Sequence, residues 1–168
     1  ILWGILPLYW KAVDHVAPLE VLAHRILWSF IFLIAILMIT QTFKKFSSEV
    51  KTIFQKPKQW LGIALASGLI SINWFVYIWA VTNDRVIETS LGYYINPLVS
   101  VLLGIVFLKE KLSFWQYISV ILALIGVLKM TLYFGGIPWV ALTLAVSFAL
   151  YGLAKKVVNL GSISGLTL

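Results

Sequence analysis

Two long apolar stretches separated by seven residues decide the fold: WLGIALASGLISINWFVYIWAV (residues 60–81) and TSLGYYINPLVSVLLGIVFL (residues 89–108). A third, FWQYISVILALIGVLKMTLYF (residues 114–134), follows after only five residues. An α-helix rises about 1.5 Å per residue, so about 20 apolar residues cross a hydrocarbon core of about 30 Å. We therefore predict three consecutive transmembrane helices.

The composition of the whole chain agrees with a membrane protein. Hydrophobic residues make up 61% of the 168 residues and charged residues only 11%, whereas a soluble domain has about 25% charged residues. A soluble domain of this size has too small an interior to bury so many apolar side chains. The sequence thus predicts an all-α, polytopic helical membrane protein.

The remaining apolar stretches predict further spans. Residues 19–40 form the second span, and a sixth begins at Pro138, after Gly135-Gly136, and ends at Lys155-Lys156. The stretch 1–13 is too short to cross a bilayer, and residues 162–168 turn apolar again just as the chain stops. We therefore expect the chain to be a piece of a longer protein.

The longest loop, residues 41–58, has its own pattern. Within it, residues 43–54 place apolar side chains at helical spacing and lysines elsewhere. Such an amphipathic segment is typical of a helix that lies on the membrane surface.

The lysines collect in every second loop. Cytoplasmic loops of membrane proteins carry an excess of Lys and Arg, which places the N-terminus and the loops 41–58, 109–113 and 155–161 in the cytoplasm. The net charge of +7 would suggest nucleic acid as the partner of a soluble protein. Here it is a topology signal, and no nucleic-acid partner is predicted. The nine lysines of these loops are Lys44, Lys45, Lys51, Lys56, Lys58, Lys109, Lys111, Lys155 and Lys156.

Polar and aromatic side chains within the third and fourth spans are the candidate substrate pathway. Polar groups inside a membrane are costly and therefore suggest function. Pro97 removes a backbone donor and Gly92 permits close approach to the backbone, so both predict a kink in the fourth span. The alternative is that these polar side chains, such as those of Asn73 and Asn96, only form hydrogen bonds that hold neighbouring helices together. The candidate contacts with a small-molecule substrate are Asn73, Trp74, Tyr77, Tyr93, Tyr94 and Asn96.

Three charged or titratable side chains near the predicted outer face are candidates for gating. His24 and Arg25 lie within the second span, and Glu88 precedes the fourth. His24 and Glu88 can change charge, so each is a candidate proton-linked group. We expect Arg25 to pair with Glu88 across the bundle, and Glu20 to face His24 on its own helix.

Signals for enzymes and cofactors are missing from the sequence. It contains no cysteine and none of the metalloprotease, serine hydrolase or P-loop motifs. We therefore expect no enzyme activity, no cofactor and no metal site, and we expect energy to come from an ion gradient. An intramembrane enzyme and a non-transporting assembly or sensor subunit remain the alternatives.

Several stretches carry a family resemblance. SLGYYINPL (residues 90–98) and FLKEKL (residues 107–112) resemble the EamA module of the drug/metabolite transporter (DMT) superfamily. WGILPLYW (residues 3–10) and NWFVYIWA (residues 73–80) are similar to the RarD-like permeases of that superfamily. Lys109 stands where the family usually has glycine.

The resemblance implies two inverted modules of five helices each, which share a central pathway. Residues 1–134 would be the first module and residues 135–168 the start of the second. The first module would pair with the whole second module of the same chain, most of which lies outside these 168 residues. It also implies a secondary-active exporter of small amphipathic metabolites or drugs in the bacterial inner membrane. Inverted repeats are a common construction of such transporters.

Overall fold

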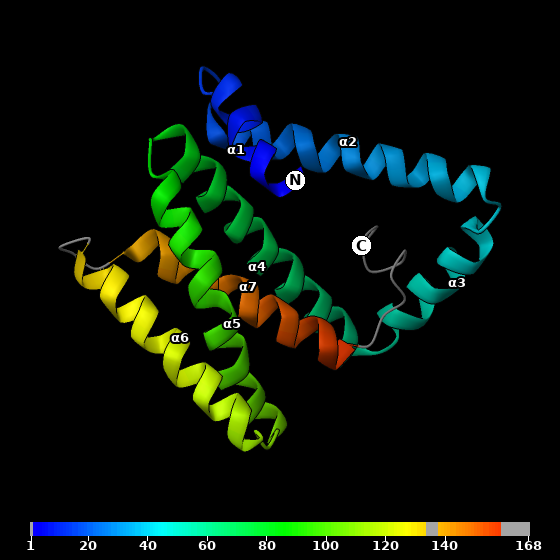
Figure 1. The fold of residues 1–168 in the computed structure, drawn as a ribbon. Helices are drawn as coiled ribbons and strands as arrows, with labels where there is room; N and C mark the ends of the chain where they lie inside the picture. Colours follow the sequence, from blue (N-terminus) through cyan, green and yellow to red (C-terminus); the bar gives the residue numbers. More distant parts are fainter. Residues whose placement is uncertain (1, 134–137, 159–168) are drawn as a thin grey trace.

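The computed structural model describes residues 2–133 and 138–158, and all elements in these ranges are helices. Five of the helices are long and apolar enough to cross a membrane, which confirms the predicted polytopic all-α membrane protein. Figure 1 shows the arrangement. The helices are α1 (Leu2–Ala12), α2 (Pro18–Ile39), α3 (Phe43–Phe54), α4 (Pro57–Thr82), α5 (Val86–Leu108), α6 (Phe114–Tyr133) and α7 (Trp139–Val158).

Local sequence explains most helix boundaries. Pro18 and Pro57 stand in the first turn of α2 and α4, where the missing N–H costs nothing. α5 ends at Leu108, and the next residue, Lys109, adopts a left-handed conformation (φ 53°). The backbone N–H of Glu110 donates to the carbonyl of Gly104. Such a bond satisfies a carbonyl that the helix end leaves open.

Three predicted boundaries were wrong by a few residues. α4 begins at Pro57, three residues before the predicted Trp60. α5 begins at Val86, three residues before the predicted Thr89, so Glu88 lies in its first turn. A carboxylate is favourable there because the helix N-terminus carries a partial positive charge. α7 continues past Lys155 and Lys156 to Val158. The predicted helix break at Gly135-Gly136 and the end of the loop 155–161 lie outside the described residues.

The surface helix was predicted with its correct ends, Phe43 and Phe54. In this helix, α3, the side chains of Phe43 and Phe54 are exposed, whereas that of Ile53 is buried. α3 contacts both α2 and α4, and it connects them at one end of the molecule (Figure 1).

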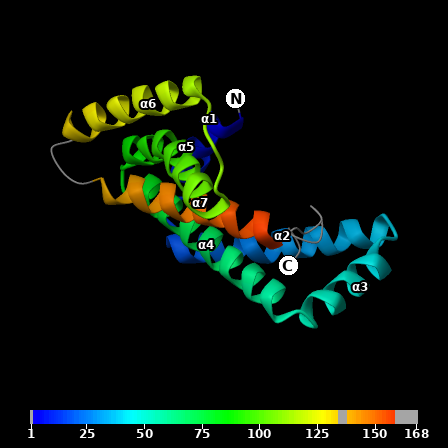
Figure 2. The same ribbon diagram turned by 90° about the horizontal axis from the view of Figure 1, so that it is seen from below.

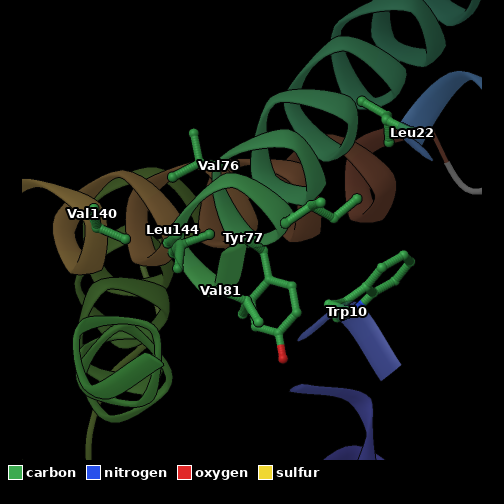
Figure 3. Packing of buried hydrophobic residues seen from close by; sticks show 9 residues of the cluster. Trp10, Leu22, Val76, Tyr77, Val81, Val140 and Leu144 are labelled. Atoms are coloured by element: carbon green, nitrogen blue, oxygen red, sulfur yellow. The ribbon is translucent and has the colours of Figure 1, made fainter. Parts of the chain in front are cut away.

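α7 is the centre of the packing although it comes last in the chain. It packs against both α4 and α5, and in Figure 2 it lies between them. Nine buried residues, labelled in part in Figure 3, form the larger core between α1, α2, α4 and α7. α6 packs against α5 and has no buried residue, so its apolar surface is left for lipid or for further protein. The core residues are Trp10, Leu22, Val76, Tyr77, Ile78, Ala80, Val81, Val140 and Leu144.

Two ion pairs connect loops that the lysine pattern places on the same side of the membrane. Lys11, at the end of α1, pairs with Asp84 in the turn between α4 and α5. At the other end of the bundle, the Lys156 Nζ of α7 lies 2.7 Å from Glu110 Oε1, in the turn between α5 and α6. Both contacts agree with the predicted alternation of the spans.

Candidate cleft between four helices

A cleft of about 590 Å³ opens between α1, α4, α5 and α7. This volume lies within the range of small-molecule sites, about 300–1,000 Å³. Its walls combine aromatic rings with amide and hydroxyl groups. The lining residues are Pro7, Asn73, Trp74, Tyr77, Thr89, Ser90, Tyr93, Asn96 and Phe148.

The structure brings together five of the six residues predicted to contact substrate. Asn73 and Tyr77 face the cleft because residues four apart share one face of a helix. The sixth, Tyr94, does not line the cleft, and 65% of its surface is exposed. It follows Tyr93 directly and therefore points away by about a third of a helical turn.

Sequence reasoning missed four lining residues. Thr89 lies four residues before Tyr93 on the same face of α5, so helical spacing could have identified it. Ser90 is its neighbour. Pro7 and Phe148 belong to α1 and α7, and no local pattern shows that these helices complete the cleft.

A series of aromatic contacts runs along one wall. The ring centroids of Trp74 and Tyr77 are 5.7 Å apart, those of Tyr77 and Tyr93 are 6.1 Å apart, and both pairs meet edge to face. Trp10 continues the series, 6.5 Å from Trp74, and Figure 3 shows Trp10 and Tyr77 on the same side of α4. Such a wall presents ring faces to an apolar or aromatic ligand.

Asn73 also holds two helices together, as the alternative interpretation predicted. Its Nδ2 donates to the carbonyl of Leu144 and to Ser147 Oγ, both on α7 and both at 2.9 Å. The side chain is 8% exposed. Ser147 Oγ also donates to the carbonyl of Leu144, so both acceptors would keep a partner without Asn73. Loss of Asn73 would remove two hydrogen bonds between α4 and α7, which contribute about 0.5–1.5 kcal/mol each.

The polar side chains of α5 that line the cleft form fewer hydrogen bonds to other helices than Asn73 does. Thr89 Oγ1 and Ser90 Oγ donate to the carbonyl of Val86, and Asn96 Oδ1 accepts a bond of 3.3 Å from Ser100. No bond from the Asn96 amide nitrogen is recorded among the described residues. A hydroxyl oxygen that donates one bond still has lone pairs to accept others. α5 therefore offers both donors and acceptors to a ligand in the cleft.

The proline of α5 lies within the same region. The helix continues through Pro97 without ending, although proline cannot bond to the carbonyl of Tyr93. Gly92 faces α7, where a Cβ atom at this position would lie 3.1 Å from the carbonyl oxygen of Ala141 and 3.2 Å from the Cβ of Leu144. The close approach of α7 at this position explains the glycine.

Arg25 lies next to the cleft and is held by tryptophan rings. Its guanidinium carbon is 3.4 Å from the ring centroid of Trp74 and 5.9 Å from that of Trp10. Contacts of this kind contribute about 0.5–2 kcal/mol each. Nη1 of Arg25 is buried and has no hydrogen-bond partner within the described structure.

The predicted ion pair between Arg25 and Glu88 was wrong. Glu88 Oε1 lies 3.5 Å from Arg85 Nη1, because both residues stand at the first turn of α5, three positions apart. Glu20 and His24 are exposed, and no bond joins them in the described part of the chain. Whether His24 or Glu88 is linked to proton movement stays a prediction.

The described residues contain no group of three or more histidine, aspartate or glutamate side chains that could hold a metal ion. Their acidic side chains are spread over the two ends of the bundle, and three of them, Asp84, Glu88 and Glu110, are paired with a basic residue. The cleft therefore offers a ligand aromatic rings, amide groups and hydroxyl groups.

Comparison with known proteins assigns a family. The EamA-like transporter family matches residues 1–132. Over its whole length the chain is 53% identical to the uncharacterized transporter YojE of Bacillus subtilis, of which it covers 56%. Over 98% of its length it is 42% identical to protein RarD of Escherichia coli, of which it covers 54%.

A more distant relative is the chloramphenicol-sensitive protein RarD of Pseudomonas aeruginosa, 29% identical over 98% of this chain and 55% of that protein. The chain thus spans about half the length of the curated relatives it matches. No solved structure matches it significantly. The family model matches well over half of the chain, and the chain belongs to the EamA-like transporter family.

Proposed function

We propose that this chain is the first part of a secondary-active permease in the bacterial plasma membrane, with residues 1–134 as a first five-helix module and residues 135–168 as the start of an inverted second one. The observation that carries the proposal is the cleft between four helices. It joins the aromatic faces of Trp74, Tyr77 and Tyr93 to the amide of Asn96. This combination suits a small amphipathic molecule.

The proposed direction is export, and the proposed energy source is an ion gradient. One relative carries chloramphenicol in its printed name, so this compound is a reasonable first probe. The test uses the full-length protein in proteoliposomes, with labelled chloramphenicol and aromatic amino acids and with or without a pH gradient. Gradient-dependent flux of any of them above that of protein-free liposomes supports a permease. Equal flux in both kinds of liposome contradicts transport of these compounds.

Single-cysteine labelling tests the proposed topology. The lysine pattern places α3 in the cytoplasm and the turn between α4 and α5 outside. In a cysteine-free, full-length background, Ser48→Cys and Asn83→Cys are expected to react with a membrane-impermeant maleimide from opposite sides. In intact cells Asn83→Cys should label and Ser48→Cys should label only after the membrane is opened. Labelling of Ser48→Cys in intact cells would reverse the whole arrangement.

A further inference from the structure

The two arginines of the chain, Arg25 and Arg85, each lie over two tryptophan rings, but they differ in whether a carboxylate pairs with them. Arg85 lies over Trp79 and Trp139, at 5.6 and 5.7 Å from the ring centroids. Arg25 likewise lies over Trp74 and Trp10. Arg85 also has a carboxylate partner, Glu88, whereas Arg25 has none in the described part of the chain.

Three acidic residues of the described structure pair with other basic residues. Asp84, Glu88 and Glu110 pair with Lys11, Arg85 and Lys156. Among the described residues, Asp14 and Glu20 are exposed and form no ion pair with Arg25. Among the described side chains, none supplies a negative charge to Arg25, although Arg25 lies inside a spanning helix. Such an arrangement is expensive and usually marks function.

Arg25 is also placed to reach a ligand in the cleft. It does not line the cleft itself, but its guanidinium carbon lies 3.4 Å from the ring centroid of Trp74, which does. The side chain as a whole is only half-buried. A guanidinium that stacks on a ring uses its face, and its N–H groups, which lie in the plane, still bind a carboxylate.

We propose that the cleft binds organic anions, with the carboxylate of the ligand beside Arg25 and its apolar body against Trp74, Tyr77 and Tyr93. The ligand thereby supplies the negative charge that Glu88 supplies to Arg85. This inference rests on the proposed function, because it assumes that the cleft is the substrate site, and it narrows the substrate class to amphipathic carboxylates.

The test compares two probes of the same shape, 3-phenylpropionate and its neutral amide, 3-phenylpropionamide. Their binding to the full-length protein in phosphatidylcholine nanodiscs is measured by calorimetry. The carboxylate is expected to bind about tenfold tighter than the amide, as a charge-assisted pair predicts. Arg25→Gln should abolish this preference, so that the two probes bind with equal affinity. Arg25→Lys should keep part of the preference, which shows that the loss in Arg25→Gln is not misfolding.

Arg85→Gln is the matched control, since it removes the other arginine above two tryptophans, and it should keep the full preference. Equal affinity of the two probes, absence of binding, or a preference that survives Arg25→Gln would overturn the anion site. A repeat of the measurement in nanodiscs with phosphatidylglycerol distinguishes a site for a free anion from a site for a lipid headgroup. Loss of the preference there would assign the site to lipid and overturn the proposal.

Flux of the same probes in proteoliposomes separates this inference from the proposed function. Flux of the amide and the carboxylate at equal rates, with equal binding, would support the permease and overturn the anion site. Binding of the carboxylate that depends on Arg25, without flux of either probe, would support the anion site and contradict transport of these probes.

Discussion

Gly92→Val is expected to remove most of the folded protein from the membrane. A Cβ atom at Gly92 would lie 3.1 Å from the carbonyl oxygen of Ala141 and 3.2 Å from the Cβ of Leu144. Valine adds two methyl groups to that contact and must push α7 away from α5. Overpacking of this kind costs about 1–3 kcal/mol, and here it acts on the helix that holds the bundle together.

The measurement is the monodisperse fraction of the full-length protein, as a fluorescent fusion, after extraction into mild detergent. Gly126→Val is the matched control, because a Cβ there meets nothing within 4 Å and the intrinsic helix cost of valine is similar at both positions. Gly126→Val should keep near wild-type levels. Equal monodisperse fractions for the two variants would show that α5 and α7 do not pack as closely as described.

Tyr93→Ala is expected to lower transport per folded molecule about tenfold. The ring lines the cleft, and its contact with an aromatic ligand would contribute about 0.5–1.5 kcal/mol beyond the area it buries. A loss near the upper end of that range corresponds to about a tenfold change. The amount of protein in the membrane should change little, because Tyr93 is 48% exposed.

Tyr94→Ala is the control for this prediction. Tyr94 is the same residue type at the next position, and it does not line the cleft. Its removal should leave flux of chloramphenicol in proteoliposomes close to wild type. If both alanine variants lose flux to the same extent, or if Tyr93→Ala loses only folded protein, the tyrosine acts through packing and not through contact with substrate.

Much of the fold could be predicted from the sequence because membrane helices satisfy local rules. Length and apolarity alone identified the spans, and an amphipathic pattern located α3 to the residue. The errors came where a helix end is fixed by a neighbour. Glu88 lies in the first turn of α5, where it pairs with Arg85, but the polar sequence before Thr89 reads equally well as a loop.

The site was predictable only within a single helix. Residues at helical spacing on α4 and α5, such as Asn73 and Tyr77, could be grouped by face. Which helices meet across a gap is decided by tertiary packing, so Phe148 of α7 was missed. Tertiary packing also explains why the predicted ion pair between Arg25 and Glu88 was wrong. Charge complementarity suggested Glu88, but two tryptophans occupy that position instead.

The central claim is that the cleft between α1, α4, α5 and α7 is the substrate pathway, and modification of Ser90→Cys tests it most directly. Ser90 lines the cleft and is exposed. In the cysteine-free full-length protein, a bulky methanethiosulfonate reagent at this position should block chloramphenicol flux, and substrate should slow the reaction. The same reagent at Ser119→Cys, on the exposed surface of α6, should leave flux unchanged. Full flux after complete modification of Ser90→Cys would contradict the account.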